Sequence, residues 1–310
     1  MRKPPPRRRE PRGLSALAPR SAALKPAAPR RVAAIVACHN RKPLTLRLLR
    51  ALQAQRGIFD LSVVLFDDGS TDGTGDAVRA EFPEVEILRG TGDAFWNGGM
   101  YRAWQRALAL KPEGYLWLND DVALDGDALV RLRAAWEDAE AMEADGALVL
   151  VGATRGAAGE LTYGGLRRER SPLALRFARV PPVERPVRVD TLNGNIVLVS
   201  ADAAARVGIL DPGFFHMYGD IDYGLRASRA GVPVLLLPGT LGVCEANPPP
   251  DLGRLSLRAR WRHIFRSPRG IHPASWWRLT RRHSGVWLPF HFLLPYRKLF
   301  YPARWLGRGV

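Results

Sequence analysis

The chain alternates short apolar runs with segments whose apolar residues recur every three or four positions. Residues 32–37 form a continuous apolar run, and the leucines within residues 44–52 then recur with helical spacing. The same succession follows at residues 61–66 and 77–82. A short apolar run is typical of a buried strand, and a repeat of three or four residues is typical of an amphipathic helix. The sequence therefore predicts a succession of strand–helix units.

Similar patterns continue through the middle of the chain. We expect further strands at residues 85–88, 115–118, 147–151 and 195–199, and helices at residues 99–110 and 125–141. Strands that alternate with helices form a mainly parallel sheet with helices on both faces, and ligands bind beyond the carboxyl ends of its strands. The predicted fold class is therefore α/β, with a Rossmann-like sheet. The Pro- and Arg-rich stretch at residues 152–194 gives no clear pattern.

Charge is concentrated at the two ends of the chain. Of the net charge of +16, residues 1–31 carry +9 and residues 254–310 carry +13, so the residues between them carry −6. Clustered Lys and Arg gain free energy by displacing counterions from polyanionic surfaces such as anionic membranes and nucleic acids. Solvated tails that keep the protein soluble would have the same charge. Charge alone leaves these alternatives open.

Composition divides the chain into a central domain, residues 31–250, and two extensions. Residues 1–30 are rich in Pro, Arg and Ala, so we expect a disordered basic arm. Residues 251–310 interleave Arg with Trp, Phe and Tyr, which suits a helical extension lying in the headgroup region of an anionic membrane. The same aromatic side chains would also serve to cover the central domain or to join copies of the chain.

Targeting signals and cysteine pairs are lacking in the sequence. No run of about 18 apolar residues and no signal-peptide pattern occurs. Cys38 and Cys244 lie far apart and form no Cys-x-x-Cys pair, which favours a reducing compartment. We therefore expect a cytoplasmic protein associated peripherally with the inner face of the cell membrane.

Two acidic loops follow predicted strands. Residues 67–74 read DDGSTDGT, in which Asp67 and Asp68 would accept hydrogen bonds from a nucleobase or ribose. Asx turns and a helix cap would use the same residues without any ligand. Residues 119–121 read NDD, and a hard divalent cation would offset the repulsion between the adjacent carboxylates. A strand-end turn without metal is the alternative.

Residues 92–100, GDAFWNGGM, combine polar side chains with glycines. Asp93 and Asn97 are candidates for hydrogen bonds to sugar or base hydroxyls. The backbone N–H groups around Gly99, at the expected start of a helix, are a candidate cradle for phosphate oxygens. Trp96 fits either this site or the core.

Residues 218–226, YGDIDYGLR, carry two acids ahead of a helical stretch. Asp220 and Asp222 are spaced i, i+2, so they face different directions. One would face a substrate and serve as general base for a hydroxyl, while the other would cap the helix or pair with Arg226. A helix N-terminus also favours acids without any catalytic role.

These segments occur in a characteristic order. They are CHNR, VVLFDDGSTDGT, GDAFWNGGM, YLWLNDDV, NGNIVLVS and FFHMYGDIDYGLRASRAG. Their order and approximate spacing, over roughly residues 31–245, resemble the inverting family 2 glycosyltransferases with the GT-A fold. The rhamnosyl- and galactofuranosyltransferase branch is the most similar. The resemblance implies that residues 31–250 form a GT-A domain.

The resemblance also implies where a nucleotide-sugar donor binds. Asp67 and Asp68 would contact the nucleoside, with Asn40 and Arg41 nearby, and Asp120 would assist at the diphosphate. These join the candidate donor-binding residues of the glycine-containing segment, namely Asp93, Trp96, Asn97 and Gly99.

For the metal, the resemblance implies that Asp121 binds Mn²⁺ or Mg²⁺ together with the donor diphosphate. Relatives often place a metal-binding His where this chain has Cys244 and Glu245, so either one of these residues substitutes for it or the metal has one protein ligand fewer. A hard cation prefers a carboxylate to a thiol, so we expect Glu245 as the further ligand.

For the base, the resemblance implies Asp220, which matches the second member of the family's acidic pair. The first member is replaced here by Gly219, and this departure raises Asp222 as an alternative base.

The predicted function is transfer of a sugar, with inversion, from a UDP- or dTDP-sugar to a hydroxyl of a cell-envelope or polyprenol-linked glycan. A nucleotidyltransferase acting on a sugar phosphate would share the sheet, but it should carry a Gly-rich loop that CHNRK matches poorly. A nucleic-acid-binding protein would explain the basic ends but not the acidic loops, so no nucleic-acid partner is expected. Association into a homo-oligomer stays open.

Overall fold

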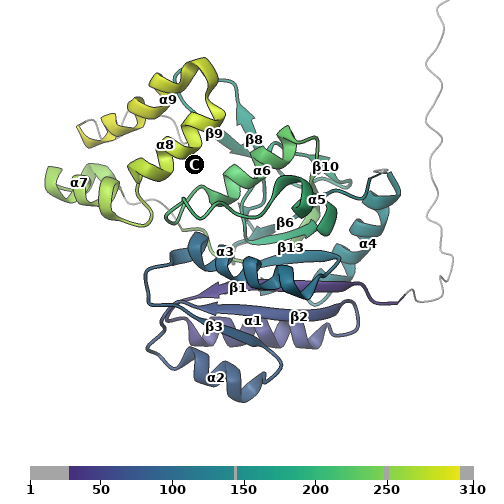
Figure 1. Ribbon diagram of the computed structural model, residues 1–310. Helices are drawn as coiled ribbons and strands as arrows, with labels where there is room; N and C mark the ends of the chain where they lie inside the picture. The colour runs from purple at the N-terminus through teal and green to yellow at the C-terminus, as the bar shows by residue number, and fades with distance from the viewer. Residues whose placement is uncertain (1–27, 143–144, 248–250, 301–310) are drawn as a thin grey trace, which may run out of the picture.

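The computed structural model describes residues 28–142, 145–247 and 251–300 (Figure 1). Its centre is a mixed sheet whose main path runs β10-β13-β6-β12-β4-β1-β2-β3, with β5 paired to β13 and β7 paired to β6. These strands are β1 (Arg31–Cys38), β2 (Asp60–Asp67), β3 (Glu86–Arg89), β4 (Gly114–Asn119), β5 (Ala123–Leu124), β6 (Val149–Arg155), β7 (Leu161–Tyr163), β10 (Val187–Arg188), β12 (Ile196–Ser200) and β13 (Val234–Val243). Strands β3, β2, β1 and β4 are mutually parallel, whereas β12 runs antiparallel to both β4 and β6. The predicted α/β fold class is confirmed.

Helices cover both faces of this sheet (Figure 1). They are α1 (Lys42–Ala54), α2 (Thr74–Glu81), α3 (Phe95–Ala107), α4 (Ala128–Met142), α5 (Ala201–Val207) and α6 (Gly219–Arg229). One apolar layer joins α1, α2 and α4 to Ala34 of β1, and the other joins α3, α5 and α6 to its neighbour Ile35. Adjacent residues of a strand face opposite sides of the sheet, so β1, which is apolar and buried after Arg31, is covered by both layers.

The Pro- and Arg-rich stretch forms a second sheet of three short strands. Its order is β11 (Thr191–Leu192), β8 (Gly165–Glu169) and β9 (Arg176–Arg179), all antiparallel. The sequence pattern did not predict these strands because they are short and carry arginines on their exposed sides, so no clear apolar alternation appears.

The C-terminal segment is helical, as predicted, and it packs on the domain. It comprises α7 (Leu257–Arg266), α8 (Pro273–His283) and α9 (Leu288–Leu293). Trp276 and Leu279 of α8 join an apolar cluster with Phe177 of the second sheet and Leu225 of α6. Trp276 thus covers the domain, which is the alternative role considered for these aromatics. Among the described helices, none is both long and apolar enough to cross a bilayer.

The expected basic arm lies almost entirely outside the described residues. Of its last residues, Arg30 is described, and its guanidinium lies 4.5 Å from the ring centroid of Trp136, where it also pairs with Glu140.

Candidate functional site

The carboxyl ends of β1, β2 and β4 meet at one edge of the sheet. Cys38 at the end of β1 pairs in register with Asp67 at the end of β2, and Ala37 pairs with Asn119 at the end of β4. The loops that follow these three strands carry the CHNR, DDGSTDGT and NDD segments. The fold therefore brings together three of the segments that sequence reasoning singled out.

Arg41 holds the two aspartates that follow β4. Its Nη1 donates to Asp120 Oδ1 at 3.0 Å and to Asp121 Oδ2 at 2.8 Å. Asp120 is 5% exposed, and burial raises its pKa to about 7, against the attraction of Arg41 and together with the repulsion of Asp121. Two carboxylate oxygens thus converge on one cationic nitrogen. A divalent cation also binds several carboxylate oxygens that point to one position. Asp120 and Asp121 therefore have the chemistry and the placement of metal ligands.

At the end of β13, a thiol rather than a carboxylate faces Asp121. Cys244 Sγ donates to Asp121 Oδ1 at 3.4 Å. Glu245 is exposed and accepts a hydrogen bond from the backbone N–H of Ala157 at 2.9 Å. Neighbouring residues of an extended segment point opposite ways. The structure therefore corrects the expectation for Glu245, whose side chain it does not bring to Asp121.

Within the part of the chain that the structure describes, no three His, Cys, Asp or Glu side chains are grouped to hold a metal ion by themselves. Asp120 and Asp121 would supply two oxygens, and a bound ligand would have to supply the others.

Asp67 and Asp68 are only 4% exposed each and are hydrogen-bonded within the protein. The two oxygens of Asp68 accept the backbone N–H groups of Gly92 at 3.0 Å and Phe95 at 2.9 Å. Asp67 Oδ1 accepts the N–H of Ser70 at 3.0 Å. Asp68 thus fastens the start of α3 to the sheet edge. The structure gives its carboxylate a structural partner on each oxygen instead of the expected nucleoside contact.

Asn40 and Asp93 are exposed near this edge. Asn40 links two loops, because its Oδ1 accepts the N–H of Thr71 at 2.7 Å and its own N–H donates to Ser70 Oγ at 2.9 Å. Asp93 accepts a hydrogen bond from Thr91 Oγ1 at 2.6 Å. Both side chains are open to a ligand.

Trp96 reaches from α3 to the end of β4. Its Nε1 donates to Asn119 Oδ1 at 2.6 Å. Asn97 is fully buried, and its Nδ2 donates to the carbonyls of Asp211 and Phe214, both at 2.9 Å. The structure therefore directs Asn97 into the core, away from the expected sugar or base hydroxyls, while Trp96 lies at the site.

The expected phosphate cradle at Gly99 is not formed. Helix α3 begins at Phe95, four residues earlier than predicted, so Gly99 lies in its second turn. A Cβ at this position would lie 2.9 Å from Ala37 Cβ and 3.0 Å from Phe66 Cδ1. Gly99 is therefore a packing residue that lets α3 lie close to β1 and β2.

Asp220 lies in the first turn of α6 and faces this edge. Its Oδ2 accepts the N–H of Gly194 at 3.0 Å, and its Oδ1 accepts the N–H of Ile221 at 2.8 Å. Burial raises its pKa, although both N–H donors oppose the rise. A Cβ on Gly194 would lie 2.6 Å from the Trp96 ring and 3.4 Å from Asp220 Cβ, so these three residues adjoin. Through Trp96, Asp220 is connected to Asn119 at the end of β4.

Strained backbone surrounds these side chains. Of the four described non-glycine residues with a positive φ, three lie here: Asn40, Phe95 and Tyr218, with φ of 52°, 52° and 79°. Such angles cost about 1–3 kcal/mol each and persist where the surroundings impose them, as at functional sites. Gly219 stands where the family has its first acid. The structure explains this glycine, because a Cβ there would overlap Asn97 Oδ1.

Asp222 lies on the other face of α6, fully buried among three cationic or polar groups. It accepts hydrogen bonds from Arg226 Nε at 2.8 Å, from Arg282 Nη1 at 2.8 Å and from His283 Nε2 at 2.9 Å. Burial alone would raise its pKa, but the hydrogen bonds and charges of these partners outweigh burial and lower it. The predicted pairing with Arg226 is confirmed. The structure corrects the expectation of Asp222 as an alternative base, because it places Asp222 away from Asp220 and its oxygens already accept hydrogen bonds.

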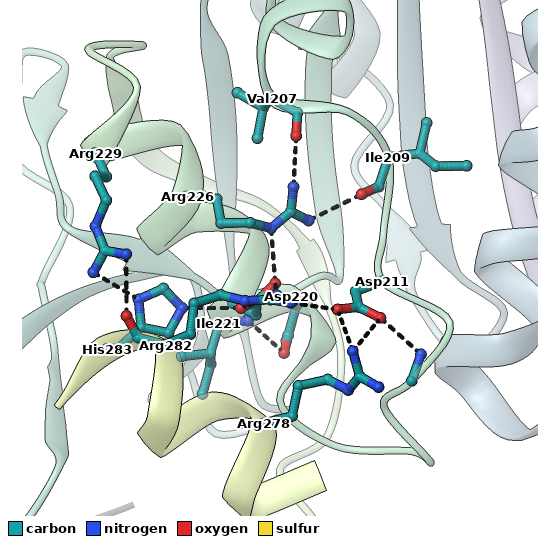
Figure 2. Close-up of polar contacts among 12 residues, drawn as sticks. Val207, Ile209, Asp211, Asp220, Ile221, Arg226, Arg229, Arg278, Arg282 and His283 are labelled. Atoms are coloured by element: carbon teal, nitrogen blue, oxygen red, sulfur yellow. Dashed lines mark hydrogen bonds and ion pairs between the residues drawn. The ribbon is translucent and has the colours of Figure 1, made fainter. Parts of the chain in front are cut away.

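The same ion-pair cluster ties α8 to the loop before α6 (Figure 2). Arg282 Nη2 donates to Asp211 Oδ2 at 2.7 Å, and Arg278 Nη1 donates to the same oxygen at 3.1 Å. Since the carbonyl of Asp211 accepts from Asn97, the C-terminal helices support α6 and α3 together.

A sequence profile described as "Glycosyltransferase like family 2" matches residues 29–263, most of the chain. The chain belongs to this family of glycosyltransferases. The resemblance inferred from the six segments is confirmed, and with it the prediction of a glycosyltransferase rather than a nucleotidyltransferase or a nucleic-acid-binding protein.

Among characterised proteins, the glycosyltransferase is similar to the N-acetylglucosaminyl-diphospho-decaprenol L-rhamnosyltransferase of Mycobacterium tuberculosis. The two are 28% identical over 277 residues, which cover 80% of each chain.

Solved structures confirm the GT-A fold. Staphylococcus aureus TarS 1–349 in complex with UDP superposes with a TM-score of 0.50 at 17% identity, over 83% of this chain and 72% of that one. GalNAc-T7 with UDP, GalNAc and Mn²⁺ gives a TM-score of 0.50 at 12% identity, over 88% of this chain and 58% of that one.

Sequence reasoning missed one residue at the site of this glycosyltransferase. His216 Nδ1 accepts the backbone N–H of Trp96 at 3.3 Å. Burial lowers its pKa to about 4, with repulsion from Arg269 and Arg41 contributing, so it is neutral at pH 7 and lies within the field of Arg41. The only signal in the sequence was its place in FFHMYGDID, four residues before Asp220.

Proposed function

We propose that this glycosyltransferase transfers a sugar, with inversion, from a UDP- or dTDP-sugar to a hydroxyl of a glycan carried on a polyprenyl diphosphate. The observation that carries this proposal is the connection from the Asp220 carboxylate through Gly194 and Trp96 to the acidic loop after β4. The name of the M. tuberculosis relative, a rhamnosyltransferase acting on a lipid diphosphate, supports the acceptor class.

Asp220 is the proposed general base. An acceptor hydroxyl loses its proton to the carboxylate while its oxygen forms a bond to the anomeric carbon from the side opposite the leaving group. The bond from that carbon to the diphosphate breaks at the same time, and the nucleoside diphosphate departs with the electron pair. A single displacement inverts the anomeric centre. Burial, which raises the pKa of Asp220, brings its basicity closer to that of an effective proton acceptor at neutral pH.

The leaving diphosphate is proposed to bind at Arg41, Asp120 and Asp121. Mn²⁺ or Mg²⁺ bound there would supply Lewis-acid stabilisation of the negative charge on the leaving group. Arg41 holds both carboxylates, and its guanidinium would bind phosphate oxygens once a cation balances the charge of the two aspartates. The Mn²⁺ bound to GalNAc-T7, which has the same fold, is in keeping with this assignment.

The donor nucleoside and sugar are proposed to lie against Asn40, Asp93 and Trp96, whose side chains reach the surface of the site. Asp67 and Asp68 are proposed to act indirectly, by holding the loops that carry those residues.

We further propose that the enzyme works in the cytoplasm at the inner face of the cell membrane. Its C-terminal helices expose Trp261, Trp277 and Trp287, each between 44% and 46% exposed, on a segment that carries no acid after residue 253. Aromatic and arginine side chains in combination bind anionic membrane surfaces. Self-association stays a prediction.

Donor binding followed by transfer tests the proposal. Thermal shift with UDP-, dTDP- and GDP-sugars, with and without Mn²⁺, should show metal-dependent stabilisation by one sugar nucleotide. The selected donor should then give transfer to a polyprenyl-diphosphate-linked N-acetylglucosamine. Absence of stabilisation by every sugar nucleotide, with stabilisation by single-stranded DNA instead, would overturn it.

A further inference from the structure

A cavity of about 410 Å³ lies between β8, the second half of α6 and the end of α8, apart from the donor site. It is lined by Arg168, Arg170, Asp190, Leu225, Ser228, Arg229 and His283. Arg229 is nine residues after Asp220 on the same helix, or about 14 Å along its axis. Because nine residues make two and a half turns, Arg229 and the cavity lie on the outer face of α6, beside α8, and not on the face that carries Asp220.

Positive charge in this cavity is poorly balanced. Arg168 and Arg170 make no side-chain hydrogen bond or ion pair with any residue that the structure describes. Arg229 donates only to neutral or backbone groups, to His283 Nδ1 at 3.3 Å and to the Arg282 carbonyl at 3.1 Å. Asp190 is the one acid of the lining. Three guanidinium groups thus face one carboxylate.

The charged form of Arg168 is disfavoured in this cavity. Burial lowers the pKa of Arg168, and repulsion from Arg229 adds to the effect, against the attraction of Asp190. Asp190 Oδ2 already accepts the backbone N–H of Arg168 at 2.7 Å. An anion held between the arginines would relieve the repulsion, and phosphate oxygens suit the planar guanidinium fork.

An exposed apolar tip adjoins the cavity. The chain leaves His283 and within seven residues exposes Val286, Trp287 and Phe290, which are 87%, 45% and 46% exposed. The tip is held beside the cavity because His291 Nε2 lies 3.0 Å from the carbonyl oxygen of Ser171, the residue that follows Arg170. Solvated apolar surface beside an anion site is a combination that a free phosphate ion does not require.

We infer that this cavity binds the phosphate group of a phosphate-bearing lipid, whose hydrocarbon chain lies on the apolar tip. The arginines recognise the headgroup and the tip recognises the chain. The inference deepens the proposed function, on which its choice of a lipid-linked acceptor rests. A bilayer phospholipid presents the same chemistry, so the experiment separates the two sources.

The test measures binding, not transfer, by the full-length protein. A chelator is present, so that no metal at Asp121 binds the diphosphate probes. The probes are farnesyl diphosphate, inorganic diphosphate, and phosphatidylcholine vesicles with and without about one-third phosphatidylglycerol. The variant is Arg168→Gln with Arg170→Gln. The matched control, Arg167→Gln with Arg185→Gln, removes two exposed arginines that do not line the cavity.

We expect farnesyl diphosphate to bind more tightly than inorganic diphosphate, and the R168Q/R170Q variant to lose roughly tenfold or more in affinity for it. The control should bind as the unaltered protein does. Val286→Ser with Phe290→Ser should lower the affinity for farnesyl diphosphate but leave the affinity for inorganic diphosphate unchanged.

A loss confined to the anionic vesicles would identify the bilayer as the source of the phosphate. Equal binding of every probe by the R168Q/R170Q variant, or an equal loss in the control, would overturn the inference. Stabilisation by the nucleotide sugar is measured separately on the same variants, with Mn²⁺ and without chelator. If that stabilisation is absent from the unaltered protein, the proposed function fails, independently of the lipid site.

Discussion

The two faces of α6 shift the pKa of an aspartate in opposite directions. Asp220 faces Gly194 and accepts only backbone N–H groups, so burial raises its pKa. Asp222, two residues later, accepts hydrogen bonds from His283, Arg226 and Arg282, which lower its pKa despite complete burial. The motif alone made the two acids interchangeable as candidates. The charge around each acid, which depends on distant parts of the chain, makes one fit for proton transfer and the other for holding the fold together.

The comparison extends to the elements on each side of α6. On the inner side lie loops of the sheet edge, which carry strained backbone and exposed polar groups. On the outer side lies α8, whose arginines are engaged in ion pairs with Asp211 and Asp222. The C-terminal helices therefore belong to the structural support of the site, whatever they also bind.

The largest effect should come from Asp220→Asn, which removes the base from the inner face. We expect kcat to fall by roughly 10³-fold, because a positioned base contributes that order of acceleration. Affinity for the nucleotide should stay nearly unchanged, since Asp220 lies on the acceptor side. Steady-state kinetics and calorimetry give the two values, and turnover close to that of the unaltered enzyme would refute the assignment.

Asp222→Asn should break the outer face instead. Two guanidinium groups lose a buried carboxylate partner, so we expect the free energy of unfolding to fall by about 3 kcal/mol. Urea denaturation measures it. The matched control is Asp76→Asn. The Asp76 side chain pairs with Arg79 and Arg89 but is 78% exposed. This substitution should lower the free energy of unfolding by less than about 1 kcal/mol. If D222N were as stable as D76N yet inactive, Asp222 would have to act in the reaction.

Asp121→Asn sharpens the account of the sheet edge. In Mn²⁺, we expect the affinity for the donor nucleotide to fall by roughly tenfold or more, because a metal oxygen ligand is lost. In chelator, the affinity should hardly change. Glu245→Gln is the control, since its side chain points to Ala157, and an equal loss in this control would restore Glu245 as a ligand.

Smaller effects should appear in the dependence of stability on pH. The pKa of Asp220 is raised in the folded state, so its favourable contribution is full below its ordinary value of 3.8 and is lost as pH rises through the folded value. At pH 7, D220N should therefore melt at a higher temperature than the unaltered protein, and at pH 3 the two should coincide.

Asp222 should behave in the opposite sense. Its folded pKa is lowered, so its contribution is present above 3.8 and is lost as pH falls through the folded value. The melting temperatures of D222N and the unaltered protein should therefore converge only in strong acid. Parallel profiles for D220N and D222N would mean that the two faces of α6 do not differ as described.

Much of the fold could be predicted because its signals are local. The apolar runs of β1, β2 and β4 and the helical repeat of α1 each lie within a few residues, and all four elements appear where expected. Helix α3 starts earlier than predicted, at Phe95, whose backbone N–H donates to the distant Asp68, a contact that a local pattern does not show.

The site was harder to predict because its contacts join residues far apart in sequence. Arg41 meets Asp121 across 80 positions, and Cys244 meets it across 123. The choice between Cys244 and Glu245 depends on the register of β13, which shifts twice against β6, and such irregularities leave no mark in the apolar pattern.

The most direct test of the account is the pH profile of transfer at saturating donor and acceptor. For the unaltered enzyme, we predict an acid limb with an apparent pKa above 3.8, the ordinary value of an aspartate, because the buried Asp220 must lose its proton before it can accept one from the substrate. The residual activity of D220N should lack this limb. The same limb in D220N would show that another group takes the proton, and would contradict the role given to Asp220.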